Sequence, residues 1–167
     1  MLSIANIMQE KQDLSYFFTA YKKETAIIKA LKEGYSKIEV AEFLHLSVAS
    51  INKTLSIFMQ KKKLFERLKT QGLFWSYDNN IDYAEFSESV FIEHTLKYGD
   101  FYDIKEIVKL FGKRKVKDVW EKTMKCDTRF IKVNYLIARV FLGLKIEVED
   151  LKKAKNARLE KLKLLIT

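Results

Sequence analysis

Four short or polar residues between positions 49 and 53 could make sequence-specific contacts with DNA. They are Ala49, Ser50, Asn52 and Lys53. An asparagine amide can donate to and accept from a base edge, a lysine ammonium can pair with a phosphate, and small side chains allow close approach. Because Val48, Ile51 and Leu55 recur at helical spacing, we expect them to form the buried side of one helix and the four to lie opposite.

The residues before this segment predict a second, shorter helix that joins it through a tight turn. Ser36 is followed three residues later by Glu39, the spacing at which a hydroxyl and a carboxylate cap the first amides of a helix. Ser47 is placed to cap the next helix. These features indicate a helix-turn-helix, and the predicted DNA contacts therefore also include Ser36, Lys37 and Ser47.

The segment resembles the helix-turn-helix of bacterial repressors and of recombinase or transposase arms, over residues 36 to 55. It differs in the turn, where those proteins usually have glycine and this chain has His45. Glycine suits a backbone with positive φ, and histidine adopts that conformation more readily than most other residues. Ala41 is small enough to let a second helix cross closely. An ordinary capped helical hairpin has the same pattern, so a purely structural role stays open.

Length and composition favour helices joined by short turns. The chain has 167 residues, no proline and five glycines, each of which follows a stretch with helical character. We expect an all-α fold with an N-terminal helix-turn-helix module of three helices at 1–60 and a small helical bundle at 73–167. A basic connector helix at 61–72, stopping at Gly72, would join them. A winged variant with a hairpin in the connector region is the alternative.

Apolar stripes at helical spacing predict further helices. They cover residues 7–22, 23–33, 104–111, 116–124, 128–142 and 148–166. Asp127 or Thr128 is placed to cap the helix at 128–142, which is apolar nearly all round and is expected at the centre of the bundle or under a partner. This helix, or the tail from 148, is the expected self-contact of a homodimer on paired DNA half-sites.

The charge distribution favours a polyanion partner. The formal net charge is +9, although the bias toward lysine, isoleucine and asparagine would also follow from an AT-rich genome. Residues 73–103 carry seven acidic groups and one lysine, whereas residues 104–167 carry eighteen basic and eight acidic groups. This asymmetry indicates either two faces or an internal pairing of opposite charges, and solvated helix faces of differing sign would give the same pattern.

Residues 73–143 resemble a family of small bacterial proteins regarded as antitoxin-like partners of AbiEii-type nucleotidyltransferase toxins. The resemblance is carried by LFWSYD at 73–78, Tyr98, Gly99, Asp100, Asp103, FGKRKVKDV at 111–119 and FLGL at 141–144. Ser76 departs from it, because the family usually has an acidic residue there. The resemblance implies that this region binds a toxin, and Trp75, Asp78, Asp100 and Asp103 are the candidate partner contacts. Trp75 and Trp120 could each be an anchor or a core residue.

The sequence offers no convergent catalytic group, so no enzyme, cofactor or metal site is expected. Neither histidine has a second one a helical turn away, and one cysteine, Cys126, excludes an internal disulfide and fits a reducing cytosol. The pair Asp78 and Asp82, or Asp100 and Asp103, could chelate a hard cation, although capping and turn roles are commoner. No apolar run approaches the ~20 residues of a membrane span, so a cytoplasmic protein is expected.

Two functional hypotheses follow. The first is a DNA-binding transcriptional regulator, an antitoxin that represses its own operon through operator DNA and neutralises a nucleotidyltransferase-type toxin. The second is a helical adaptor that binds proteins and not DNA, in which the helix-turn-helix is only a folding unit.

Overall fold

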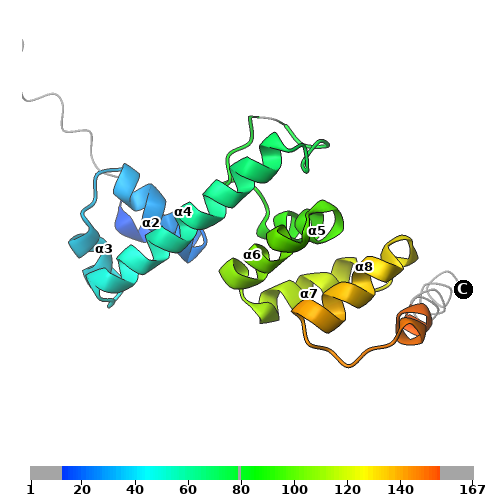
Figure 1. The fold of residues 1–167 in the computed structure, drawn as a ribbon. Helices are drawn as coiled ribbons and strands as arrows, with labels where there is room; N and C mark the ends of the chain where they lie inside the picture. Colours follow the sequence, from blue (N-terminus) through cyan, green and yellow to red (C-terminus); the bar gives the residue numbers. More distant parts are fainter. Residues whose placement is uncertain (1–12, 79, 155–167) are drawn as a thin grey trace, which may run out of the picture. The chain divides into compact units, whose positions relative to one another are not determined.

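The computed structural model describes residues 13–78 and 80–154. Over these residues the regular secondary structure is helical, with no strand (Figure 1), so the predicted all-α fold class is confirmed. The chain divides into two compact units, Met1–Lys62 and Lys63–Thr167. Each unit has buried apolar residues of its own.

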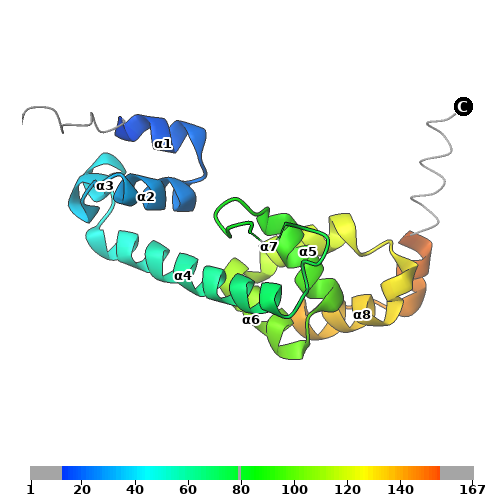
Figure 2. The ribbon, with the colours of Figure 1, turned by 90° about the horizontal axis from the view of Figure 1, so that it is seen from above.

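The first unit contains three short helices and the beginning of a long one (Figure 2). They are α1 (Leu14–Ala20), α2 (Lys23–Lys32), α3 (Lys37–Phe43) and the N-terminal part of α4 (Val48–Thr70). Asp13 starts α1 by accepting a hydrogen bond from the Ser15 amide at 3.1 Å. Residues 7–12 of the predicted leading helix lie outside the described residues.

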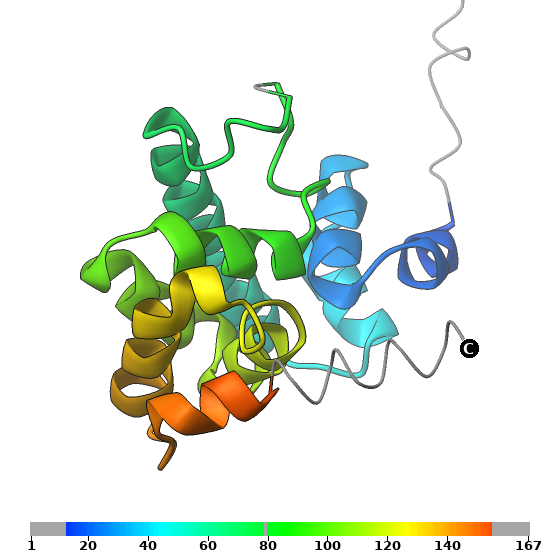
Figure 3. The same ribbon diagram turned by 90° about the vertical axis from the view of Figure 1, so that its right-hand side faces the viewer.

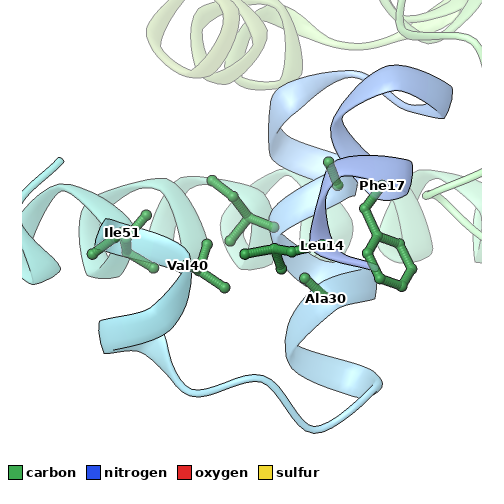
Figure 4. Packing of buried hydrophobic residues seen from close by; sticks show 8 residues of the cluster. Leu14, Phe17, Ala30, Val40 and Ile51 are labelled. Carbon is green, nitrogen blue, oxygen red and sulfur yellow. The ribbon is translucent and has the colours of Figure 1, made fainter. Parts of the chain in front are cut away.

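One hydrophobic cluster joins these four helices, and Figure 4 shows its side chains turned toward one another. Its members are Leu14, Phe17, Ala26, Ile27, Ala30, Val40, Ala41 and Ile51. Ile27 and Ile51 are fully buried, and a large aliphatic side chain buried in this way contributes roughly 1.5–3 kcal/mol. Ala41 is buried in the same cluster, with 3% of its surface exposed.

Helix α4 runs without interruption for 23 residues. The predicted second helix of the motif and the predicted connector helix are therefore one element, and the connector region contains no hairpin over its described helical residues. The segment has neither proline nor glycine and contains five lysines and three leucines, so nothing in it stops a helix that has begun. The helix ends at Thr70, two residues before Gly72, which has φ +81°.

The second unit is a bundle of shorter helices. It contains α5 (Glu88–Tyr98), α6 (Phe101–Phe111), α7 (Lys113–Thr123), the 3-10 helix η2 (Thr128–Phe130), α8 (Ile131–Leu136) and the π-helix η3 (Ile137–Phe141). The helices predicted at 104–111 and 116–124 are confirmed as α6 and α7. Residues 148–154 are also helical and are drawn in orange-red in Figure 3, and the remainder of the predicted tail helix lies outside the described residues.

Aromatic side chains form much of the core of the second unit. The ring of Phe65 stacks on Phe74 with centroids 5.0 Å apart and meets Phe91 edge-on at 5.5 Å. Such pairs contribute about 0.5–1.5 kcal/mol beyond the area they bury. Phe74 belongs to the LFWSYD run, so part of that run specifies packing. Trp75, the next residue, is 77% exposed, which excludes the core alternative for it.

The predicted helix at 128–142 is divided into η2, α8 and η3, and its N-cap is Asp127. The predicted helix is apolar nearly all round, and the exception that matters is on the buried side of α8, where Asn134 is only 1% exposed. The opposite side carries Leu136 and Val140, which are 43% and 59% exposed. Lys132 and Arg139 are exposed as well, so this segment has one face in the core and an outer face of mixed apolar and basic residues.

Candidate nucleic-acid interface

The capping residues of α3 adopt the arrangement that their spacing predicts. The Ser36 amide donates to the Glu39 carboxylate at 2.6 Å, and the Glu39 amide donates to the Ser36 hydroxyl at 3.2 Å. This reciprocal pair satisfies two amides that the helix itself leaves open. It fixes where α3 begins and therefore where Lys37, its first residue, is placed.

The turn between α3 and α4 is closed by the strained residue that the sequence predicts. His45 has φ +52°, the only non-glycine residue with positive φ in the described chain. The Leu46 amide donates to the Ala41 carbonyl at 2.8 Å across the turn. A left-handed residue at this point ends α3 and redirects the chain, because the helical hydrogen bonds cannot continue through it.

Ser47 begins α4 by accepting a hydrogen bond from the Ser50 amide at 3.1 Å, and the two hydroxyl oxygens are 3.1 Å apart. Ile51 is fully buried in the core of the first unit. Since a helix turns by about 100° per residue, burial of Ile51 directs the residues around it outward. The side chains exposed in this way are those of Ala49, Ser50, Asn52 and Lys53, as the sequence predicts.

Lys37 and Asn52 form a contact that the sequence does not predict. The Lys37 ammonium donates to Oδ1 of Asn52 at 2.8 Å, so an exposed hydrogen bond links α3 to α4. The two residues are fifteen positions apart, and no helical periodicity connects them. Because Oδ1 of Asn52 accepts from the ammonium, the Nδ2 amino group is the part of the amide that can donate to another group.

One residue of the predicted buried stripe lies elsewhere. Val48 is 38% exposed, and Ile38 and Phe43 of α3 are 60% and 43% exposed. Val48 is the first residue of α4, where side chains lean back toward the preceding turn and away from the core. The predicted stripe therefore holds for Ile51 and Leu55 and fails at Val48.

A partly buried ion pair links α4 to α2. The Lys61 ammonium lies 2.8 Å from Oε2 and 3.1 Å from Oε1 of Glu24, and the lysine side chain is only 5% exposed. Lys61 is the first residue of the predicted basic connector helix at 61–72. Its burial removes it from the residues that could contact phosphate.

Three of the four predicted partner contacts lie on the surface of the second unit. Trp75 is 77% exposed, and Asp78 and Asp100 are exposed. Asp103 is buried at 3% exposure, which contradicts a direct partner contact. Asp103 accepts a hydrogen bond from the Asp100 amide at 2.9 Å, because a carboxylate at the third position of a helix reaches back to its N-cap. It also pairs with Arg67 at 2.8 Å.

The acidic pairs have capping and turn roles. Asp78 accepts from the Asn80 amide at 2.8 Å, and Asp82 accepts from the Ala84 amide at 2.9 Å. Asp100 and Asp103 cap one helix reciprocally. Among the described residues, no group of three or more histidine, cysteine or acidic residues could hold a metal ion.

Asn134 is the polar residue that reasoning from the sequence missed. Its Oδ1 accepts from Trp120 Nε1 at 3.0 Å, and its Nδ2 donates to the carbonyls of Met124 at 2.8 Å and Asp127 at 3.1 Å. Trp120 is fully buried, so it is a core residue and not an anchor. An asparagine within a helix that is otherwise mostly apolar is a signal of a buried polar contact, but its partner Trp120 is fourteen positions away and on another helix.

Two further polar side chains, those of Arg129 and Cys126, make contacts in or next to the loop after α7. The Arg129 guanidinium donates to both oxygens of Asp127, at 3.0 and 2.7 Å, and this hydrogen bonding lowers the pKa of the Asp127 carboxyl below its ordinary value. The Cys126 thiol lies 3.6 Å from the carbonyl of Ala154, a weak hydrogen bond to the last described helix. Both contacts are structural in character.

No helix of the described chain is both long and apolar enough to span a membrane. Comparisons with protein-family models, with curated proteins and with solved structures find no match for this chain. Its local geometry and the resemblances of its sequence therefore carry the functional assignment.

Proposed function

We propose that the chain is a DNA-binding transcriptional regulator that reads operator DNA through α3 and α4. The observation that carries the proposal is the exposed polar face at the start of α4, where Asn52 and Lys53 lie opposite the buried Ile51. A recognition helix needs one face in the core and short or polar side chains on the other. The left-handed turn at His45 supports the same reading.

In this proposal the second unit binds a protein partner. Trp75, Asp78 and Asp100 are exposed on a unit whose sequence resembles antitoxin-like partners of nucleotidyltransferase toxins. A toxin that handles nucleic acid has a basic surface, which exposed carboxylates could cover while the indole fills an adjoining pocket. The chain would thus repress its own operon and neutralise the toxin.

We also propose that the chain binds DNA as a homodimer, since helix-turn-helix proteins read paired half-sites. Leu136 and Val140 lie four residues apart and are exposed beside Lys132 and Arg139, and a second copy could pack on these two apolar side chains. Light scattering at micromolar concentration, with and without DNA, tests this point. A monomer under both conditions contradicts it.

Two experiments test the assignment. Footprinting on the DNA upstream of the chain's own gene should reveal a protected site whose affinity falls steeply with salt. Co-purification with the product of the adjacent gene should retain a nucleotidyltransferase. A chain that gives no footprint yet retains a protein partner is an adaptor and not a regulator.

The adaptor remains the second candidate because of one observation on the first unit. Phe43 and Val48 are large apolar residues exposed on either side of the α3–α4 turn, and Ile38 is exposed at the start of α3. Apolar side chains beside a recognition helix suit a protein contact better than a phosphate backbone. Under this alternative, substitution of Ile38 by Asp abolishes partner binding, whereas the regulator retains its partner when Ile38 is changed.

A further inference from the structure

The outer side of α6 and the first turn of α7 carry exposed basic residues with no ion-pair partner among the described residues. Lys105 and Lys109 are one turn apart on α6, so they lie on the same side of the helix. Lys113 and Arg114 follow Gly112 as the first two residues of α7. These four residues are called the α6–α7 basic surface below.

The nearest carboxylates are engaged with other cations. Asp103 and Glu106 of α6 both pair with Arg67, at 2.8 and 3.2 Å. Glu88 of α5 pairs with Lys115, the third residue of α7. Asp118 lies one turn after the start of α7 and makes no ion pair with a described residue. Its single charge lies four residues after Arg114, so the four cations of the α6–α7 basic surface keep a net positive charge.

Local electrostatics does not explain basic residues at this position. The N-terminus of a helix has a partial positive charge, and a cation there is unfavourable by about 0.3–1 kcal/mol. In the described structure α7 has Gly112 as its N-cap, no side-chain cap and no acidic residue in its first turn. By contrast, α6 begins with the reciprocal cap of Asp100 and Asp103. The amides that open α7 are thus available to an anion, as are the side chains around them.

We propose that the α6–α7 basic surface binds the phosphate backbone of duplex DNA without reading its sequence. Tyr102 is 75% exposed and lies three residues before Lys105, so its hydroxyl extends the row of donors along α6. Lysine, arginine, tyrosine and helix N-termini are the groups that proteins use for phosphate contacts. The choice of duplex DNA as the polyanion rests on the proposed function. The second unit would then add affinity while α4 supplies specificity.

The test compares variants of the full chain on a 20-base-pair duplex of arbitrary sequence. Lys109→Gln combined with Arg114→Gln should remove two phosphate contacts, which flattens the slope of log affinity against log salt by about 1.8, at about 0.9 per contact. Lys145→Gln combined with Lys153→Gln is the matched control, since both lysines are exposed in the same unit. The control should keep the wild-type slope. Equal slopes for both double variants and the wild type overturn the proposal.

Two further arms separate this proposal from others. Lys53→Ala in α4 should also flatten the slope of log affinity against log salt. If Lys53→Ala flattens the slope and the Lys109 and Arg114 variant does not, this inference is refuted and the proposed function is intact. The reverse result supports the inference and refutes the proposed function. Vesicles containing phosphatidylserine test an anionic membrane as the ligand. If the Lys109 and Arg114 variant loses vesicle binding while its DNA slope is unchanged, a lipid surface replaces DNA.

Discussion

Replacing Asn134 by Ala should destabilise the second unit by about 2–5 kcal/mol. The substitution removes three hydrogen bonds, to Trp120, Met124 and Asp127, within a site that is 1% exposed. The indole N–H of Trp120 would lose its acceptor, and a buried polar group left unsatisfied costs about 1–3 kcal/mol. The Met124 carbonyl would keep the hydrogen bond from the Asp127 amide at 2.7 Å. The cavity left by the amide adds to this, because a close-packed core relaxes only in part.

Urea unfolding followed by tryptophan fluorescence measures the effect, since Trp120 is buried and Trp75 is 77% exposed. Asn52→Ala, at an exposed position, is the control and should stay within about 0.5 kcal/mol of the wild type. Combining Trp120→Phe with Asn134→Leu should cost less than the sum of the two single changes, because donor and acceptor are removed together. An Asn134→Ala protein as stable as the wild type would refute the network as a source of stability.

Three other predictions concern groups whose contacts are defined above. Glu24→Ala should cost about 1–3 kcal/mol in urea unfolding, because it removes the carboxylate that pairs with the buried Lys61 ammonium; the range is below that of fully buried pairs since Glu24 is 38% exposed. The pKa of Asp127 is lowered in the folded state, so its contribution to the free energy of unfolding is present above about pH 4 and is lost as the pH falls through the folded-state pKa. The free energy of unfolding of Asp127→Asn should therefore depend less on pH between about 5 and 2.5 than that of the wild type. Parallel pH profiles for the two proteins would contradict this. In DNA binding, Lys37→Met and Asn52→Ala should be coupled by about 0.5 kcal/mol or more in a double-mutant cycle, whereas additive effects would show that their hydrogen bond has no part in recognition.

Local signals made the helices and the turn predictable from the sequence. Ser36 and Glu39 cap α3 through a contact between near neighbours, and His45 takes positive φ because the chain must turn within a few residues. Gly112 and Gly143 likewise follow helices with φ +80° and +62°. Such features depend on a few adjacent residues, so the printed sequence contains most of what determines them.

Contacts between distant residues were not predictable in the same way. Lys37 meets Asn52 across fifteen positions, and Lys61 is buried only because Glu24 comes from another helix. Asp103 has the composition of a surface residue, yet its pairing with Arg67 makes it part of the interior. Periodicity assigns a residue to a side of its own helix but does not say which element will cover that side.

The boundary of the recognition helix shows the same limit. Val48 fits the apolar period of α4 but is exposed at its first turn, and the helix continues to Thr70 through a segment that composition alone marked as a connector. Helix ends depend on stop signals, and none occurs before Gly72.

The central claim is that α4 reads DNA, and selection of binding sites from a random duplex library tests it most directly. The wild-type chain should enrich a defined sequence, and Asn52→Ala should relax preference at one base pair by roughly 1–3 kcal/mol. Lys53→Ala should weaken all sequences together and flatten the salt dependence, with the preferred sequence unchanged. Enrichment and salt dependence that are the same for the wild type and both variants would contradict the claim, because α4 would then have no part in DNA binding.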